Sequence, residues 1–185
     1  MYKLLIYPVE EIKRTVKHPS LSRTLILGLI EALLLAFGTL IFMSVLPLPI
    51  SIGALSALFA AASTLVITIV LLLLFSLFFT IVMHILSDGG FYEGLTSIVY
   101  GFAAPCAAIF LGSILSYIIP TAGIVIAALL YIFGVTIGFA TFFRTAKELF
   151  DADYITIWLA MSALVMVVVL TVYAVILIVA AIAPF

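Results

Sequence analysis

The sequence predicts an all-α, polytopic membrane protein: a bundle of five transmembrane helices preceded by a short amphipathic helix. The 185-residue chain is 68% hydrophobic and 8% charged, whereas a soluble domain carries roughly 25% charged residues. Its seven Lys and Arg and eight Asp and Glu residues are also clustered, because all of them except Glu31 lie at 3–23, 88–93 or 144–153. The apolar stretches between these segments are too long for a water-soluble core and require the bilayer as solvent.

Five apolar stretches reach the roughly 20 residues that a transmembrane helix needs. Residues that end helices separate them: Pro47 and Pro49 follow the first stretch, and Pro120 lies between the third and the fourth. Asp88 and two glycines follow the second stretch, and Asp153 is placed to cap the last helix. The predicted spans are about 21–46, 54–86, 95–119, 121–143 and 155–182.

Three of the spans have features that bear on their shape or packing. Span 54–86 exceeds the roughly 30 Å apolar core of a bilayer at about 1.5 Å per residue, so it must tilt or project beyond the membrane. Pro105, near the middle of the third span, lacks the N–H of one helical hydrogen bond and predicts a kink. Gly134 and Gly138 form a GxxxG pattern in the fourth span, which favours close packing of helices within the bundle or between two copies of the chain.

The chain divides into a polar N-terminal segment, residues 1–20, and a single transmembrane domain, residues 21–185. Residues 8–18 predict a short interfacial helix with an apolar face, flanked by lysines whose stems can lie in the interface while their ammonium groups stay in water. A solvated connector is the alternative. The apolar face consists of Val9, Ile12 and Val16, and the lysines are Lys13 and Lys17.

The positive residues predict the orientation of the chain. All seven Lys and Arg residues lie before or at the start of the first span or between the fourth and the fifth, and the two loops on the other side have none. The positive-inside rule therefore places the N-terminus in the cytoplasm and, with five spans, the C-terminus outside. The first span follows about twenty polar residues without a clear cleavage site, which predicts a retained helix and not a signal peptide.

Glu31 is the one charged residue predicted to lie inside the membrane. An acidic group near the bilayer centre costs on the order of 2.5–3.5 kcal/mol on insertion scales, so it needs a partner, a proton or a watery cavity. It is a candidate proton or cation site, or a gate. The alternative is a neutral carboxyl that fixes helix packing. The candidate partners are His84, Tyr100, Thr39 and Ser63.

The remaining chemical signals are weak. His84 and Asp88 share a helix face and are candidate metal ligands, but no HExxH motif, cysteine pair or second nearby histidine supports them. The single cysteine, Cys106, lies in an apolar run. No nucleophile motif, phosphate-binding glycine loop or basic patch is present, so we expect no enzyme, no cofactor and no nucleic-acid partner.

Two short patterns resemble the Yip domain family, small multispan proteins named for their interaction with Ypt/Rab GTPases. They are Gly89-Gly90-Phe91-Tyr92-Glu93, and then Tyr100-Gly101-Phe102 with Pro105. The short N-terminal segment makes the chain similar to the minimal prokaryotic members. The resemblance implies a five-span fold, a non-enzymatic role in membrane organisation or trafficking, and a prokaryotic plasma membrane as the location.

Two functional hypotheses follow. The first is a membrane organiser or adaptor that contacts a cytoplasmic protein partner through residues 2–20, 87–94 and 144–154, with the lipid bilayer as its other partner. The second is a small transporter or channel subunit that uses Glu31 as a proton or cation site, with Pro105 as a hinge. An intramembrane enzyme is the least supported alternative. A homo-oligomer is compatible with each of them.

Overall fold

A computed structural model describes residues 8–45 and 54–182, and this part of the chain is helical without strands. Five helices in it are long and apolar enough to cross a membrane, which indicates a multi-pass membrane protein. The predicted links at Pro47 and Pro49, and the residue Lys3, lie outside the described residues. The helices are α2 (Pro8–Lys17), α3 (Leu21–Val45), α4 (Ala54–Leu86), α5 (Phe91–Ile118), α6 (Pro120–Phe150) and α7 (Tyr154–Ile182).

The predicted boundaries differ from the observed ones mainly where charged residues at a helix end were left outside the span. The bounds of α4 are those expected, and α3 and α7 begin within one residue of them. By contrast, α5 begins four residues earlier than expected, at Phe91, and α6 continues seven residues beyond the expected end at 143. A helix ends where its backbone hydrogen bonding ends, and not where the polarity of its side chains changes. Arg, Lys and Glu are good helix formers, so α6 continues through its charged residues without interruption.

Two aspartates in the turn between α6 and α7 have different roles. Asp151 adopts a left-handed conformation with φ of 48° and ends α6. Asp153 accepts a hydrogen bond from the backbone N–H of Thr156 at 2.7 Å, which confirms the predicted cap. Hydrogen bonds from the side chain and from the backbone N–H of Thr156 lower the pKa of Asp153.

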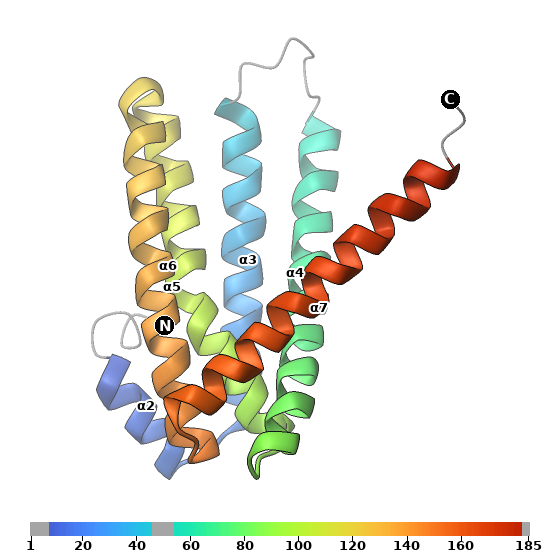
Figure 1. The fold of residues 1–185 in the computed structure, drawn as a ribbon. Coiled ribbons are helices and arrows are strands. Elements are labelled where there is room, and N and C mark those ends of the chain that lie inside the picture. Colours follow the sequence, from blue (N-terminus) through green and yellow to red (C-terminus); the bar gives the residue numbers. More distant parts are fainter. Residues whose placement is uncertain (1–7, 46–53, 183–185) are drawn as a thin grey trace.

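The helices are arranged so that the charged segments meet at one end of the bundle (Figure 1). We call this the charged end. It consists of α2, the turn 87–90 between α4 and α5, the end of α6 from residue 144, and the turn 151–153 between α6 and α7. The helices α3 and α5 both start there and run side by side. The most extensive contact is between α5 and α6, whereas α7 crosses the bundle obliquely and contacts mainly α4.

Large buried side chains gather near the charged end. The ring of Phe79 on α4 packs edge-on against Phe142 and Phe150 of α6, at centroid distances of 5.1 and 5.7 Å. Met83 of α4 and Ile157 of α7 complete this cluster and are fully buried. The cluster therefore joins three spanning helices at the end where their turns also lie.

The helix α2 packs on the bundle. Ile12, on its predicted apolar face, is fully buried and clusters with Leu27 of α3 and with Leu95 and Val99 of α5. Val9 and Val16 remain partly exposed, at 37% and 36%. The predicted helix is therefore confirmed, and the centre of its apolar face is covered by protein.

Candidate functional site

A seam of small and hydroxyl side chains joins α3 to α5, and we call it the α3–α5 seam. Near the charged end the backbone N–H of Ser20 donates to the hydroxyl of Tyr92 at 3.1 Å, and the hydroxyls of Thr24 and Thr96 lie 3.2 Å apart. Both pairs are separated by 72 residues in the sequence. The two helices therefore run in the same direction with a constant register.

Two glycines of α3 continue this register deeper into the bundle. A Cβ atom at Gly28 would lie 3.4 Å from Val99, and one at Gly38 would lie 3.4 Å from the hydroxyl of Ser113. Small residues at such positions let helix backbones approach closely in membranes. Because Glu31 lies between the two glycines, the register places it opposite α5 residues 102–106.

Glu31 is fully buried in this seam. Within the described part of the chain, neither of its carboxyl oxygens has a hydrogen-bond partner. Cys106 of α5, also buried, is near enough to interact with it electrostatically. No described cationic side chain pairs with this enclosed carboxyl, so it is more stable neutral than ionised, because ionisation would leave a poorly compensated charge at membrane depth.

The four partners proposed for Glu31 from the sequence are wrong. Thr39 and Ser63 donate to carbonyl oxygens of their own helices, at Leu35 and Phe59. Tyr100 bonds to Thr15, and His84 lies at the charged end beside Gly89. Hydroxyl groups in membrane helices readily bond to the carbonyl one turn earlier, and this local bond replaces the expected contact between helices.

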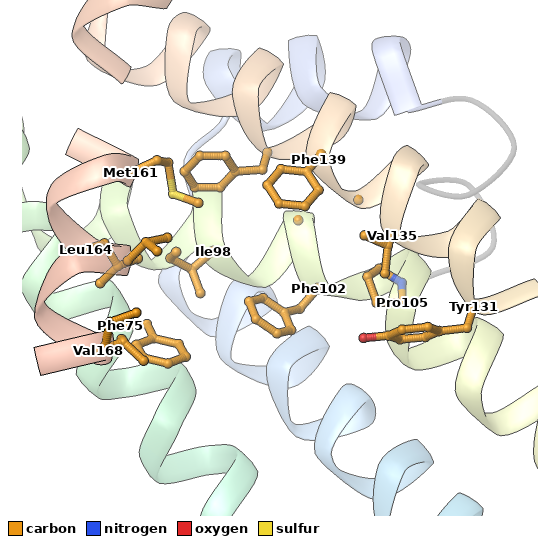
Figure 2. A pocket seen from close by; sticks show the side chains of 15 residues that line it. Phe75, Ile98, Phe102, Pro105, Tyr131, Val135, Phe139, Met161, Leu164 and Val168 are labelled. Carbon is orange, nitrogen blue, oxygen red and sulfur yellow. The ribbon is translucent and has the colours of Figure 1, made fainter. Parts of the chain in front are cut away.

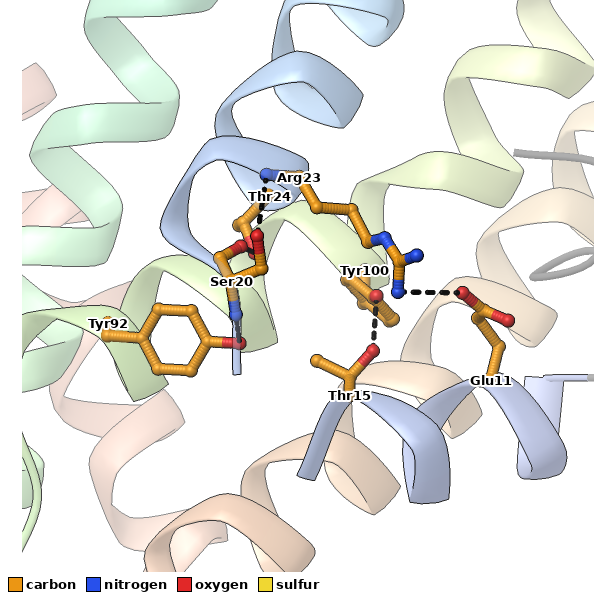
Figure 3. A network of polar contacts seen from close by, with 7 residues as sticks. All are labelled: Glu11, Thr15, Ser20, Arg23, Thr24, Tyr92 and Tyr100. Atoms are coloured by element: carbon orange, nitrogen blue, oxygen red, sulfur yellow. Dashed lines mark hydrogen bonds and ion pairs between the residues drawn. The ribbon is translucent and has the colours of Figure 1, made fainter. Parts of the chain in front are cut away.

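The side chain of Tyr100 instead fastens α2 to the bundle. Its hydroxyl lies 2.6 Å from that of Thr15, and either can be the donor. Arg23 of α3 adds a weak ion pair with Glu11 of α2, at 3.8 Å (Figure 3). Thr15 is buried whereas Arg23 is exposed, so the hydroxyl pair is the stronger constraint.

The residues of the first family-like pattern form the turn between α4 and α5. A side chain at Gly89 would overlap the ring of Phe150, and the backbone N–H of Gly90 donates to the Glu93 carboxylate at 2.9 Å. Ser87 donates to the carbonyl of Phe150 at 2.8 Å, so this turn is tied to the end of α6. Phe91 is 40% exposed.

Gly101 and Pro105, from the second pattern, meet the GxxxG pair of α6. Pro105 lies inside the continuous helix α5 and has no N–H for the carbonyl of Gly101. A Cβ atom at Gly138 would overlap that carbonyl oxygen, and one at Gly134 would lie 2.6 Å from Ala108. The two glycines therefore face α5 of the same chain, and Gly138 fills the space beside the freed carbonyl.

The candidate metal ligands His84 and Asp88 do not form part of a cluster that would hold an ion. In the described ranges 8–45 and 54–182, no group of three His, Cys, Asp or Glu side chains converges. The Nδ1 atom of His84 lies 3.1 Å from the carbonyl oxygen of Gly89, and Asp88 is exposed in the turn. His84 thus closes the turn after α4.

A pocket of about 380 Å³ opens between α4, α5, α6 and α7. Figure 2 shows its apolar lining, in which the Tyr131 hydroxyl is the one polar side-chain group drawn. Such a surface can accept an apolar chain, but it lacks the convergent polar groups that orient a substrate. The lining includes Phe75, Ile98, Phe102, Pro105, Phe139 and Leu164.

Comparisons with known proteins found no match for this chain among family models, curated proteins or solved structures. The geometry of the chain itself therefore carries its functional interpretation.

Sequence reasoning missed the hydroxyl pairs that join α2, α3 and α5. Thr24, Glu31 and Gly38 are spaced by seven residues, which places them on one stripe of α3. This spacing is the signal in the sequence that could have identified the seam. The partners Thr15 and Thr96 carry no comparable signal, because isolated threonines are common in membrane helices.

Proposed function

We propose that this protein is a non-enzymatic membrane organiser or adaptor that binds a cytoplasmic protein through its charged end. The resemblance to the Yip domain family motivates the proposal. The observation that carries it is that three charged segments, far apart in the sequence, lie at one end of the bundle. The seven Lys and Arg residues predict that this end faces the cytoplasm of a cell whose plasma membrane holds the protein.

Two kinds of contact support a preformed surface at this end. Side-chain hydrogen bonds connect α2 to α5 and the turn 87–90 to the end of α6. The aromatic cluster around Phe79 fixes α6 and α7 beneath that turn. Because these elements are held before any partner binds, little conformational entropy is lost on association.

Charges of both signs lie on this surface. α2 has glutamates in its first turn and exposed basic residues in the rest of the helix, and the turns present exposed acidic residues. A partner with the complementary pattern gains orientation from it, since charge complementarity determines specificity and register. The basic residues are Lys13, Arg14 and Lys17, and the acidic residues are Asp88, Asp151 and Asp153.

A site-specific photo-crosslinking experiment in intact cells tests the proposal. A photoreactive residue is placed at Lys13 or at Glu148, both exposed at the charged end, and at Leu129, which is 62% exposed in the apolar part of α6. We expect the same protein partner from Lys13 and Glu148 and none from Leu129. Monodisperse, partner-free protein at both charged positions would contradict the proposal.

Transport is a second candidate, and the burial of Glu31 without a hydrogen-bond partner among the described residues favours it. A small transporter or channel subunit would bind or relay a proton or cation at this carboxyl. Reconstitution into sealed liposomes tests it by comparing the wild type with Glu31→Gln. Flux that the substitution abolishes supports transport, whereas folded wild-type protein without flux contradicts it.

A further inference from the structure

The α3–α5 seam has a layered order between Glu31 and the charged end. Nearest the surface are the polar contacts of Ser20 with Tyr92 and of Thr24 with Thr96. Deeper in the bundle lies an apolar layer that contains Leu27 and Val99. Glu31 follows, about 10 Å deeper than Thr24 at helical rise.

The apolar layer is completed by a residue from outside the two helices. Ile12 of α2 is fully buried against Leu27 and Val99. The Thr15–Tyr100 hydrogen bond holds α2 in this position. Since α2 is only ten residues long, its displacement would remove one wall of the apolar layer without unfolding a spanning helix.

We propose that Glu31 is a proton-binding site and that α2 closes its access route from the charged end. This site goes beyond the adaptor role, and it stands whether or not the protein transports anything. The ligand is the proton, because protonation removes the charge that the enclosed position does not compensate.

A metal ion is the wrong ligand for this position. Divalent ions take several oxygen, nitrogen or thiolate donors, and no cluster of three such side chains occurs in the described residues. The seam hydroxyls are already bonded, since Thr24 pairs with Thr96 and Ser113 donates to Ile109.

Among the described residues, no titratable group on the packed elements, the lysines and the arginine of α2 included, pairs with Glu31. On α5 these groups are Cys106 and Tyr100, which are neutral or anionic. Arg23, on α3 itself, is exposed at the charged end and is directed at Glu11 of α2. On α4, His84 lies at the charged end beside Gly89.

Infrared spectroscopy of the reconstituted full-length protein reads the protonation state directly. The spectrum of Glu31→Gln is subtracted from that of the wild type at neutral pH. We expect a positive C=O stretching band of a neutral carboxyl, which the variant lacks. Carboxylate bands in the same difference spectrum would overturn the proton site, because Glu31 would then be ionised.

Hydrogen–deuterium exchange of that carboxyl band tests the role of α2. After transfer to deuterated buffer, we expect Ile12→Ala to exchange about tenfold faster than the wild type or more, since removing an enclosed side chain weakens local closure. The matched control Val9→Ala, on the same apolar face but 37% exposed, should exchange at the wild-type rate. Tyr100→Phe, which keeps the apolar layer and removes the hydrogen bond to Thr15, should also exchange faster.

The outcomes separate this proposal from the transport hypothesis. A neutral carboxyl band with accelerated exchange in Ile12→Ala supports the closed proton site even if liposomes show no flux. Equal exchange rates in the wild type, Ile12→Ala and Tyr100→Phe would overturn closure by α2.

Discussion

The two ends of the bundle are held together in different ways. At the charged end, large side chains such as Phe79, Met83 and Phe150 are buried, and hydrogen bonds connect separate elements. In the other half, the buried residues are small, for example Ala108, Gly112 and Ser113, and large apolar side chains face outward.

This difference follows from the solvent at each depth. Lipid tails solvate Leu and Phe as well as protein does, so helices at that depth associate through close packing of small residues. At the charged end, water competes for polar groups, and burial of large side chains becomes favourable. The charged end is therefore a packed, hydrogen-bonded structure, which supports the proposal that it is a binding surface.

The largest expected effect comes from the aromatic cluster. Phe79→Ala should destabilise the protein by about 3 kcal/mol, because a cavity remains where the ring contacted Phe142 and Phe150. Phe59→Ala is the matched control, since Phe59 is 76% exposed in the opposite half. Reversible unfolding in mixed micelles measures both, and equal losses would contradict the contrast between the ends.

A smaller loss is expected from crowding the uncharged half. A Cβ atom at Gly112 would lie 2.9 Å from the Cβ atom of Ala127, so Gly112→Val should force α5 and α6 apart and cost about 2 kcal/mol. Ala128→Val, at an exposed position of α6, serves as the control. The same unfolding assay should find the control close to the wild type; an unchanged Gly112→Val would show that the two helices are not in close contact.

Tyr100→Phe should have a more modest effect. It leaves the buried hydroxyl of Thr15 without its partner and should cost about 1 kcal/mol. The double variant with Thr15→Val should recover part of this loss, because both polar groups are then absent. Limited proteolysis within residues 8–17 reports the release of α2, and protection equal to the wild type in the single variant would argue against the attachment.

The smallest effect concerns pH and the cap of α7. The hydrogen bond from Thr156 lowers the pKa of Asp153 below its ordinary value of 3.8. Its contribution to stability is therefore complete above that value and is lost as the pH falls through the lowered pKa. The stability difference between the wild type and Asp153→Ala should be constant near neutrality and should shrink in acid; a difference independent of pH would contradict the ionic cap.

Hydropathy and helix-breaking residues predicted much of the fold. The five spans and the bounds of α4 follow from length, Pro and Gly. The extension of α6 to Phe150 did not, because hydropathy reports depth in the membrane and not the end of backbone hydrogen bonding. The pattern of charged and apolar residues predicted α2, but it did not predict which residues of the bundle cover its apolar face.

The candidate site was less predictable for a physical reason. Burial of Glu31 was expected from its apolar surroundings, but its neighbours depend on the rotation and register of α3 against α5. A helix that is apolar on all sides gives no hydrophobic face from which to read that rotation. The contacts of Gly28 and Gly38 with residues about 70 positions away determine the rotation of α3 against α5.

The central claim is that the charged end is one preformed surface, and a distance measurement in the membrane tests it most directly. Spin labels are attached to cysteines that replace Lys13 on α2 and Glu148 on α6, both exposed, in a chain whose buried Cys106 is replaced by Ala. We expect a single narrow distribution of the distance between the two labels in lipid bilayers without any partner. A broad distribution would contradict it, because α2 would then be detached and the surface would not exist before binding.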